Sequence, residues 1–172
     1  CNNSITITGD YDTLVQLKPV VEAGEGLLQA ICPMPKELEG TTAPSDEPNW
    51  YDWCNANWGT KWDPEVHLEF IDNKDGTATI QGWFDTAWAP PLEAFQSLAQ
   101  DWDSCYIELF YEEGGMCFVG CWDSEGADDY YEYSDATSKT ISDIVPKYLV
   151  DQFALDERLS EYEQEEEESA DA

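Results

Sequence analysis

Two short turns constrain what this chain can fold into more than any other feature of its sequence. The segment 72–76 (Asp-Asn-Lys-Asp-Gly) separates two stretches of alternating apolar and polar residues, 66–71 and 77–84. The pair Gly114-Gly115 separates 105–111 from 116–122 in the same way. Strands joined by so short a connection pair antiparallel. We therefore predict an antiparallel sheet that contains these four strands together with a strand over 4–8.

Helical spacing of apolar residues accounts for much of the remaining chain. Apolar residues recur at i, i+3 and i+7 within 10–23 and within 91–101, and they predict a helix in each segment. A third apolar stripe predicts a final helix over 140–159, which Pro146 should kink or begin. Residues 129–133 are expected to add a short edge strand.

The order strand, helix, strand, strand, helix, strand is that of a split βαβ sheet. The fold class expected is therefore α+β: a ferredoxin-like split βαβ antiparallel sheet with an inserted Trp-rich helix, extra C-terminal hairpin strands and a closing C-terminal helix. The 172 residues, 42% of them hydrophobic, suit a single domain over 1–155 with an insertion at 25–63. The segment 156–172 has too few apolar residues to pack, so we expect an acidic tail that is frayed or disordered.

Four tryptophans fall within residues 50–63, a density that ordinary surface composition does not produce. At helical spacing the aromatic residues of this segment form a broad face, and Gly59 ends the helix. Two interpretations stay open: the rings cover one edge of the sheet, or they form a recognition surface, because Trp and Tyr dominate binding hot spots. Burial is favoured for Trp53 and Trp58. The two interpretations weigh about equally for the residues at the helix ends, Trp50, Tyr51 and Trp62.

Several motifs occur in an order that can be compared with known families. They are Cys-Asn-Asn-Ser-Ile-Thr-Ile-Thr-Gly at 1–9, Ile-Cys-Pro-Met-Pro-Lys-Glu-Leu at 31–38, the Trp-rich block at 50–63, Phe-Asp-Thr-Ala-Trp-Ala-Pro-Pro at 84–91 and Tyr-Glu-Glu-Gly-Gly-Met-Cys-Phe-Val-Gly at 111–120. Over roughly 1–125 the chain resembles the YubB-type ferredoxin-like family of small proteins, which are encoded mostly by phages and plasmids. The resemblance implies a ferredoxin-like fold and no catalytic residue. Gly114 stands where that family's hairpin often has Pro, which implies a looser turn.

The charge of the chain is strongly negative: 38 acidic against 7 basic side chains leave a formal net charge of -31. Such a chain repels nucleic acid and anionic lipid. The segment 156–172 holds nine carboxylates and one arginine, so residues 1–155 keep 29 acidic and 6 basic side chains, a net of -23. The folded body is therefore anionic in its own right. Adaptation to high salt is a competing explanation, but Arg158 is the one arginine among the seven cations, and haloarchaeal proteins generally prefer Arg to Lys.

These observations favour a non-enzymatic acidic interaction protein of a phage or mobile element, acting in the host cytoplasm. In its sharper form the hypothesis is a nucleic-acid mimic that blocks a basic nucleic-acid-binding host protein, such as a restriction, CRISPR or other nuclease or a transcription factor. The alternative is an accessory protein-binding domain that uses its Trp-rich face. Direct nucleic-acid or membrane binding is not expected. The candidate acidic residues are Asp101, Asp103, Glu112, Glu113, Asp123, Glu125, Asp128, Asp129 and Glu132.

No catalytic, cofactor-binding or metal-binding residue is expected. His67 is the one histidine, at an alternating strand position where a structural or surface role is more common than catalysis. Six cysteines are present, but Cys117 and Cys121 fall four residues apart on a predicted strand, about 13 Å between Cα atoms, too far for a disulfide or shared metal. We expect reduced thiols. The chain starts at Cys1, which fits a lipidated mature N-terminus or, as we favour, a fragment of a longer reading frame.

Overall fold

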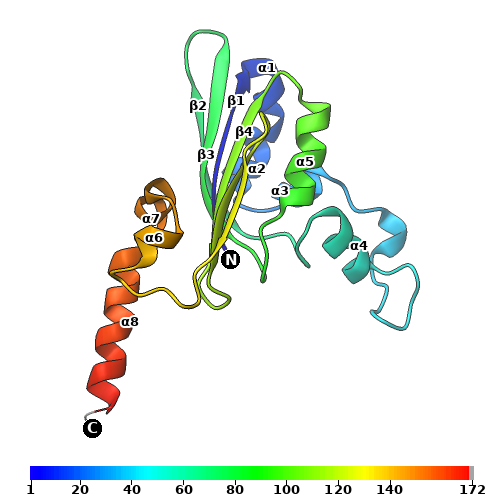
Figure 1. Ribbon diagram of the computed structural model, residues 1–172. Coiled ribbons are helices and arrows are strands. Elements are labelled where there is room, and N and C mark those ends of the chain that lie inside the picture. The colour runs from blue at the N-terminus through cyan, green and yellow to red at the C-terminus, as the bar shows by residue number, and fades with distance from the viewer. Residues whose placement is uncertain (171–172) are drawn as a thin grey trace.

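The computed structural model describes residues 1–170 and contains a six-stranded antiparallel sheet with helices on both faces (Figure 1). The strand order across the sheet is β2-β3-β1-β4-β5-β6. The first four strands therefore have the spatial order β4-β1-β3-β2 of a split βαβ sheet, as predicted. The strands are β1 (Asn2–Asp10), β2 (Val66–Asp72), β3 (Thr77–Asp85), β4 (Tyr106–Glu113), β5 (Phe118–Asp123) and β6 (Asp128–Glu132).

Strand β1 lies in the middle of the sheet and pairs antiparallel with both β3 and β4. Because side chains alternate across a strand, Ile5 and Ile7 point to one face and are 1% exposed, whereas Ser4, Thr6 and Thr8 point to the other. The helices of the first two thirds of the chain cover the face of Ile5 and Ile7 (Figure 1). They are α1 (Tyr11–Leu14), α2 (Lys18–Ala23), α3 (Leu27–Ile31), α4 (Trp50–Asn57) and α5 (Leu92–Asp101).

The helix predicted over 10–23 is divided into two short helices. A 3-10 turn, Val15–Leu17, separates α1 from α2, and Pro19 lies in the first turn of α2, where its missing N–H costs least. Gly24 ends α2 in the left-handed conformation, with φ 74°. The insertion is more ordered than expected, since it contains α3 and a second 3-10 turn, Lys36–Leu38, besides α4.

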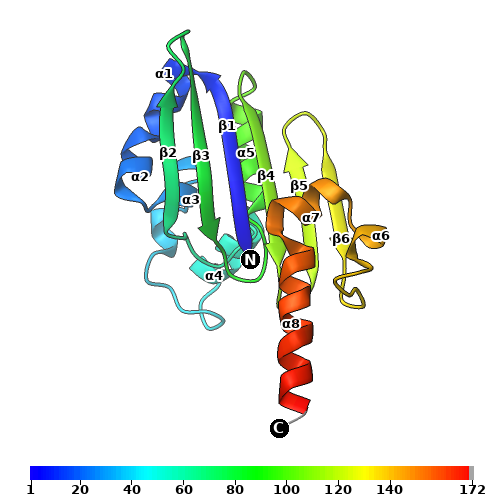
Figure 2. The same ribbon diagram turned by 90° about the vertical axis from the view of Figure 1, so that its left-hand side faces the viewer.

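The C-terminal third of the chain packs on the opposite face of the sheet (Figures 1 and 2). Its helices are α6 (Ile141–Ile144), α7 (Lys147–Phe153) and α8 (Leu155–Ala170). Pro146 precedes α7, as expected for a residue that begins a helix, and Ala154, in a left-handed conformation with φ 49°, separates α7 from α8. A second core forms between these helices and strands β5 and β6, with Val119, Ile141 and Leu149 fully buried.

The expected frayed or disordered tail is instead helix α8, as far as Ala170; residues 171–172 lie outside the described part of the chain. Two polar contacts join this helix to the body. The carboxylate of Glu163 accepts hydrogen bonds from the backbone N–H and hydroxyl of Ser138, both at 2.8 Å. Arg158 binds Glu112 of β4 at 2.9 Å. The tail therefore has tertiary partners that its own composition does not reveal.

Glu112 was predicted to belong to an acidic surface, and that prediction is wrong. Its side chain is 3% exposed and lies between Arg158 and Tyr133, whose hydroxyl donates a hydrogen bond to it. Burial and then the bond to Glu112 raise the pKa of Tyr133, so its phenol stays protonated. Glu112 therefore links β4 to α8 and does not offer a charge to a partner.

We expect Arg158→Met to destabilise the fold by about 1–3 kcal/mol, because it leaves the buried Glu112 carboxylate without a cation while Arg158 itself is partly solvated. Urea unfolding measures the change. Lys147→Met is the matched control: Lys147 forms an exposed pair with Asp151 at 2.6 Å, and its loss should change the free energy of unfolding much less than the loss of Arg158. Equal losses of unfolding free energy in the two variants would show that the buried Glu112 carboxylate does not need Arg158 for stability.

We also expect Gly82→Ala in β3 to destabilise the protein by about 2 kcal/mol or more, because both backbone and space require glycine there. Gly82 has φ 149°, and a Cβ atom would lie 2.1 Å from the backbone oxygen of His67 in the neighbouring strand. Gly40→Ala is the control, since Gly40 has φ 78° but nothing within 4 Å of its Cβ position. Thermal unfolding should show the larger loss at Gly82; a larger loss at Gly40 would contradict the steric explanation.

Candidate functional site

The remaining acidic candidates do not form one surface, because the antiparallel pairing divides them between the two ends of the sheet. Asp123 lies opposite Glu108 near the start of β4, and Asp128 lies opposite Trp122 beside it. Glu113 and Glu132 both lie opposite Phe118, at the other end of the same strands. Along β4, five residue steps lie between Glu108 and Glu113, so about 17 Å separates the two groups.

One end of the sheet collects carboxylates from elements that are far apart in the sequence. This acidic edge lies at the top of Figures 1 and 2, where β1 and α5 end and the β2–β3 and β5–β6 turns lie. Five of its residues were candidates from the sequence, and the other four, Asp10, Asp12, Asp72 and Asp75, were not. The nine residues of the acidic edge are Asp10, Asp12, Asp72, Asp75, Asp101, Asp103, Asp123, Glu125 and Asp128.

Contacts between the elements hold the acidic edge together. The backbone N–H of Tyr11 donates to the oxygen of Gly76 at 3.0 Å, which joins the end of β1 to the β2–β3 turn. Gly9 packs directly against Cys105, and this contact brings Asp10 beside the loop that carries Asp103. Burial raises the pKa of the Cys105 thiol, and the nearby charges of Asp10 and Asp103 raise it further. Two lysines lie close by: Lys74 binds Asp72 at 2.8 Å, and Lys18 lies near the same carboxylate. The edge therefore keeps a large excess of negative charge.

Asp123 has its charge fixed by the turn that follows β5. One carboxylate oxygen accepts hydrogen bonds from the backbone N–H groups of Glu125, Gly126 and Ala127, at 2.8, 2.8 and 2.9 Å. These bonds, led by that from Ala127, lower the pKa of Asp123. Burial and then the neighbouring charges of Glu108 and Asp123 raise the pKa of Tyr106 to about 12, so its hydroxyl stays protonated between them.

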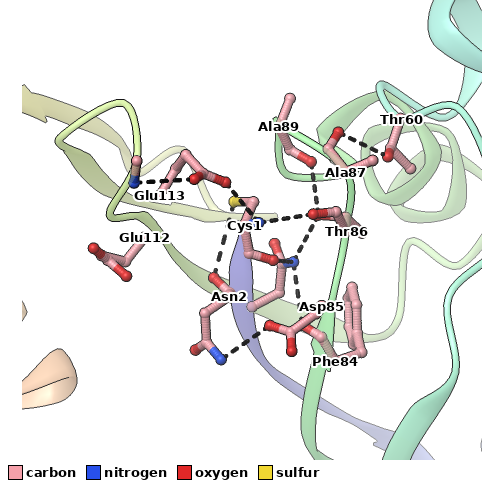
Figure 3. Close-up of polar contacts among 12 residues, drawn as sticks. Cys1, Asn2, Thr60, Phe84, Asp85, Thr86, Ala87, Ala89, Glu112 and Glu113 are labelled. Atoms are coloured by element: carbon pink, nitrogen blue, oxygen red, sulfur yellow. Dashed lines mark hydrogen bonds and ion pairs between the residues drawn. The ribbon is translucent and has the colours of Figure 1, made fainter.

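The other predicted acidic residues lie away from this edge. Glu113 forms an ion pair with the amino group of Cys1 at 2.6 Å (Figure 3). Asp129 accepts a hydrogen bond from the hydroxyl of Tyr148 at 2.8 Å, so it helps to attach α7 to the sheet. Glu132 is exposed at the end of β6. These residues have different surroundings, and the structure does not bring them together with Asp101 or Asp103.

The Trp-rich segment combines buried and exposed rings. Trp58 is 4% exposed, and its indole N–H donates to the oxygen of Cys32 at 2.7 Å; Trp53 packs edge-on against it. Trp50 is half-buried, whereas Tyr51 and Trp62 are 41% and 51% exposed. Burial was favoured for Trp53 and Trp58; Trp58 is buried, whereas Trp53 is half-buried like Trp50.

The most exposed tryptophan, Trp88, was not among the candidates. It is 66% exposed and has φ 70°, a left-handed conformation that is rare for a bulky residue. Its loop is held by the hydroxyl of Thr86, which donates to Ala89 and accepts from the buried amide of Asn3, and by Thr60, which donates to Ala87 (Figure 3). The same bond between Thr60 and Ala87 brings this loop beside the segment that carries Trp62. Trp88 stands between Ala87 and Ala89 in the sequence, and its exposure cannot be recognised without knowledge of these contacts.

His67 is exposed and stacks on Trp83 of the neighbouring strand, with 4.1 Å between ring centroids. The two rings lie on the face of the sheet opposite Ile5 and Ile7, where none of the described helices covers β2 and β3. Within residues 1–170 no three His, Cys, Asp or Glu side chains are arranged to hold a metal ion. The six cysteines are free thiols. Cys117 does not lie on the strand as predicted: it has φ 55° in the turn before β5, so its distance from Cys121 cannot be derived from a regular strand. None of the described helices is long and apolar enough to span a bilayer.

A comparison with known protein families agrees with this architecture. Residues 57–170 match the family described as the ferredoxin-like domain in Api92-like protein. The crystal structure of protein api92 from Yersinia pseudotuberculosis is 20% identical, with a TM-score of 0.40, and the match covers 63% of this chain and 40% of that chain. No curated protein matches. The matched segment includes β2 to α8, and the chain belongs to the family of ferredoxin-like domains of Api92-like proteins.

Proposed function

We propose that this protein is a non-enzymatic interaction protein of a phage or mobile element, and that its acidic edge binds a basic, nucleic-acid-binding host protein. The observation that carries the proposal is that nine carboxylates from separate elements lie along one end of the sheet, with two lysines near them. Carboxylates held at fixed positions can occupy a site that is built for phosphates. The protein would then exclude DNA or RNA from a nuclease, a restriction or CRISPR effector or a transcription factor.

The distribution of charge supports binding to a basic surface more than it supports solubility alone. A solubility role requires only that acids be spread over the surface. At the edge, however, Asp72, Asp75 and Asp123 are held by hydrogen bonds from their own turns, and the contact of Gly9 with Cys105 places Asp10 beside the loop of Asp103. Like charges held together repel each other, and a cationic partner would relieve that repulsion. The same field accelerates association with a basic protein.

A second candidate function rests on the exposed aromatic rings. Trp62 and Trp88 are 51% and 66% exposed, and the bond between Thr60 and Ala87 brings their loops together. Large exposed rings on a held backbone are typical of protein-binding hot spots. In this reading the domain is an accessory protein-binding module, and its acidity serves solubility or adaptation to high salt.

The first proposal predicts that charge reversal at the acidic edge weakens partner binding more than the same reversal on α8. Proteins captured from a bacterial lysate should be basic nucleic-acid-binding proteins, and added duplex DNA should displace them. With the captured partner purified, the edge variant should associate about tenfold more slowly at low salt and show a weaker dependence on salt, as expected when steering charges are lost. The edge variant is Asp101→Lys, Asp103→Lys, Glu125→Lys and Asp128→Lys.

The control carries the same change in net charge on exposed positions of α8: Glu161→Lys, Glu165→Lys, Glu166→Lys and Glu168→Lys. Equal slowing in the two variants would mean that only total charge matters, and the mimic would be rejected. If Trp62→Ala with Trp88→Ala abolishes binding while the edge variant binds normally, the aromatic function replaces it.

A further inference from the structure

A hollow beside the first turn of α4 is lined by aromatic side chains and lies in an acidic part of the chain. Its volume is about 490 Å³, and it is formed by residues 41–44 and by Trp50, Tyr51 and Asp52. The rings of Trp50 and Tyr51 meet at 90° with 5.7 Å between centroids, so they form two perpendicular walls. The acidic edge lies on other elements, and this hollow is a separate feature.

Hydrogen bonds keep the hollow in shape. The hydroxyl of Thr41 donates to the oxygen of Leu38 at 2.7 Å and accepts from the backbone N–H of Trp50 at 2.9 Å, which holds the loop against the helix. Asn49 caps α4 by accepting from the N–H of Asp52 at 3.0 Å and donating to one carboxylate oxygen of Asp52 at 2.7 Å. The exposed Asp52 carboxylate is thereby fixed at the rim.

The charge around the hollow favours a cationic occupant. Residues 37–60 contain five acidic side chains and no lysine or arginine. Elsewhere the protein places its own cations over aromatic rings: Lys61 lies 4.1 Å from the ring centre of Trp62, and Lys18 lies 5.7 Å from that of Phe70. Among the described residues, no such cation lies over Trp50 or Tyr51. A planar guanidinium can stack on an aromatic wall while it donates to a carboxylate.

We propose that this hollow binds an arginine side chain of the basic partner, stacked on Trp50 or Tyr51 and paired with Asp52. The inference rests on the proposed function for the identity of the partner. It adds a specific site, at which one arginine of that partner would be bound. The acidic edge would supply long-range attraction, whereas the hollow would supply a short-range, geometry-dependent contact.

The test uses N-acetyl-argininamide as the probe and follows the indole N–H signal of Trp50 by two-dimensional NMR. We expect a saturable shift of that signal, with the uncharged isostere N-acetyl-citrullinamide binding at least several-fold more weakly. Asp52→Asn keeps the oxygen that accepts from Asn49 and should weaken binding about two- to fivefold, the size expected for an exposed ion pair. Tyr51→Ala should weaken binding to a similar extent, because it removes one aromatic wall.

Two matched controls separate the site from general effects. Asp143→Asn removes an exposed carboxylate from the first turn of α6, and Tyr162→Ala removes an exposed ring from α8; both should bind the probe as the native chain does. Unchanged signals from the other tryptophans would show that each variant is folded. Absence of a saturable Trp50 shift, equal binding of the citrulline derivative, or equal weakening by the control variants would overturn the inference.

The acidic-edge variant distinguishes this inference from the proposed function. It should bind the probe normally, because none of its four substitutions lies in the hollow. Normal probe binding together with undiminished partner association would reject the acidic edge and retain the arginine site. Loss of probe binding in that variant would show that binding depends on charges outside the hollow, and it would overturn the inference.

Discussion

The alternation of side chains along the central strand β1 decides how the rest of the molecule is arranged. Ile5 and Ile7 lie on one face of the sheet, so the helices α1 to α5 must cover that face to remove apolar surface from water. Ser4, Thr6 and Thr8 lie on the other face, which the C-terminal helices cover only around β5 and β6. The face of β1 to β3 therefore remains open, with Trp83 and His67 stacked on it.

The two cores give the protein a rigid frame on which charge can be presented. Strand β5 is buried on both sides, because the helices on either face pack against it or its neighbours. Helix α8 extends this frame, held through the buried Glu112 and through Ser138. Three carboxylates of the acidic edge, those of Asp72, Asp75 and Asp123, accept hydrogen bonds from their own turns and are held by them. Carboxylates held in this way differ from the charges of a flexible segment, which attract a cation without specifying a geometry.

Acidic groups and exposed aromatic rings would contribute to partner binding in different ways. Negative charges act over about a Debye length, roughly 8 Å at physiological salt, and in the proposed function they would steer a basic protein towards the acidic edge. Exposed rings such as Trp62 and Trp88 act only in contact, and their held backbones reduce the entropy lost on binding. The protein has both kinds of group: the rings lie on the loops joined by Thr60 and Ala87, and the carboxylates lie on the acidic edge.

The sequence by itself determined the local structure and the overall character of this protein. Short turns specified antiparallel pairs, apolar spacing located the segments of α1–α2, α5 and α7, and composition fixed the large negative charge, because each of these depends on neighbours in the chain or on totals. Only the tertiary structure decided which carboxylates meet and which are buried. Asp10 lies near the loop of Asp103 because strand order places β1 beside β4 and Gly9 against Cys105, and Glu112 is buried because Arg158 arrives from a distant helix. Partners far apart in sequence become neighbours through packing, and local patterns carry no record of them.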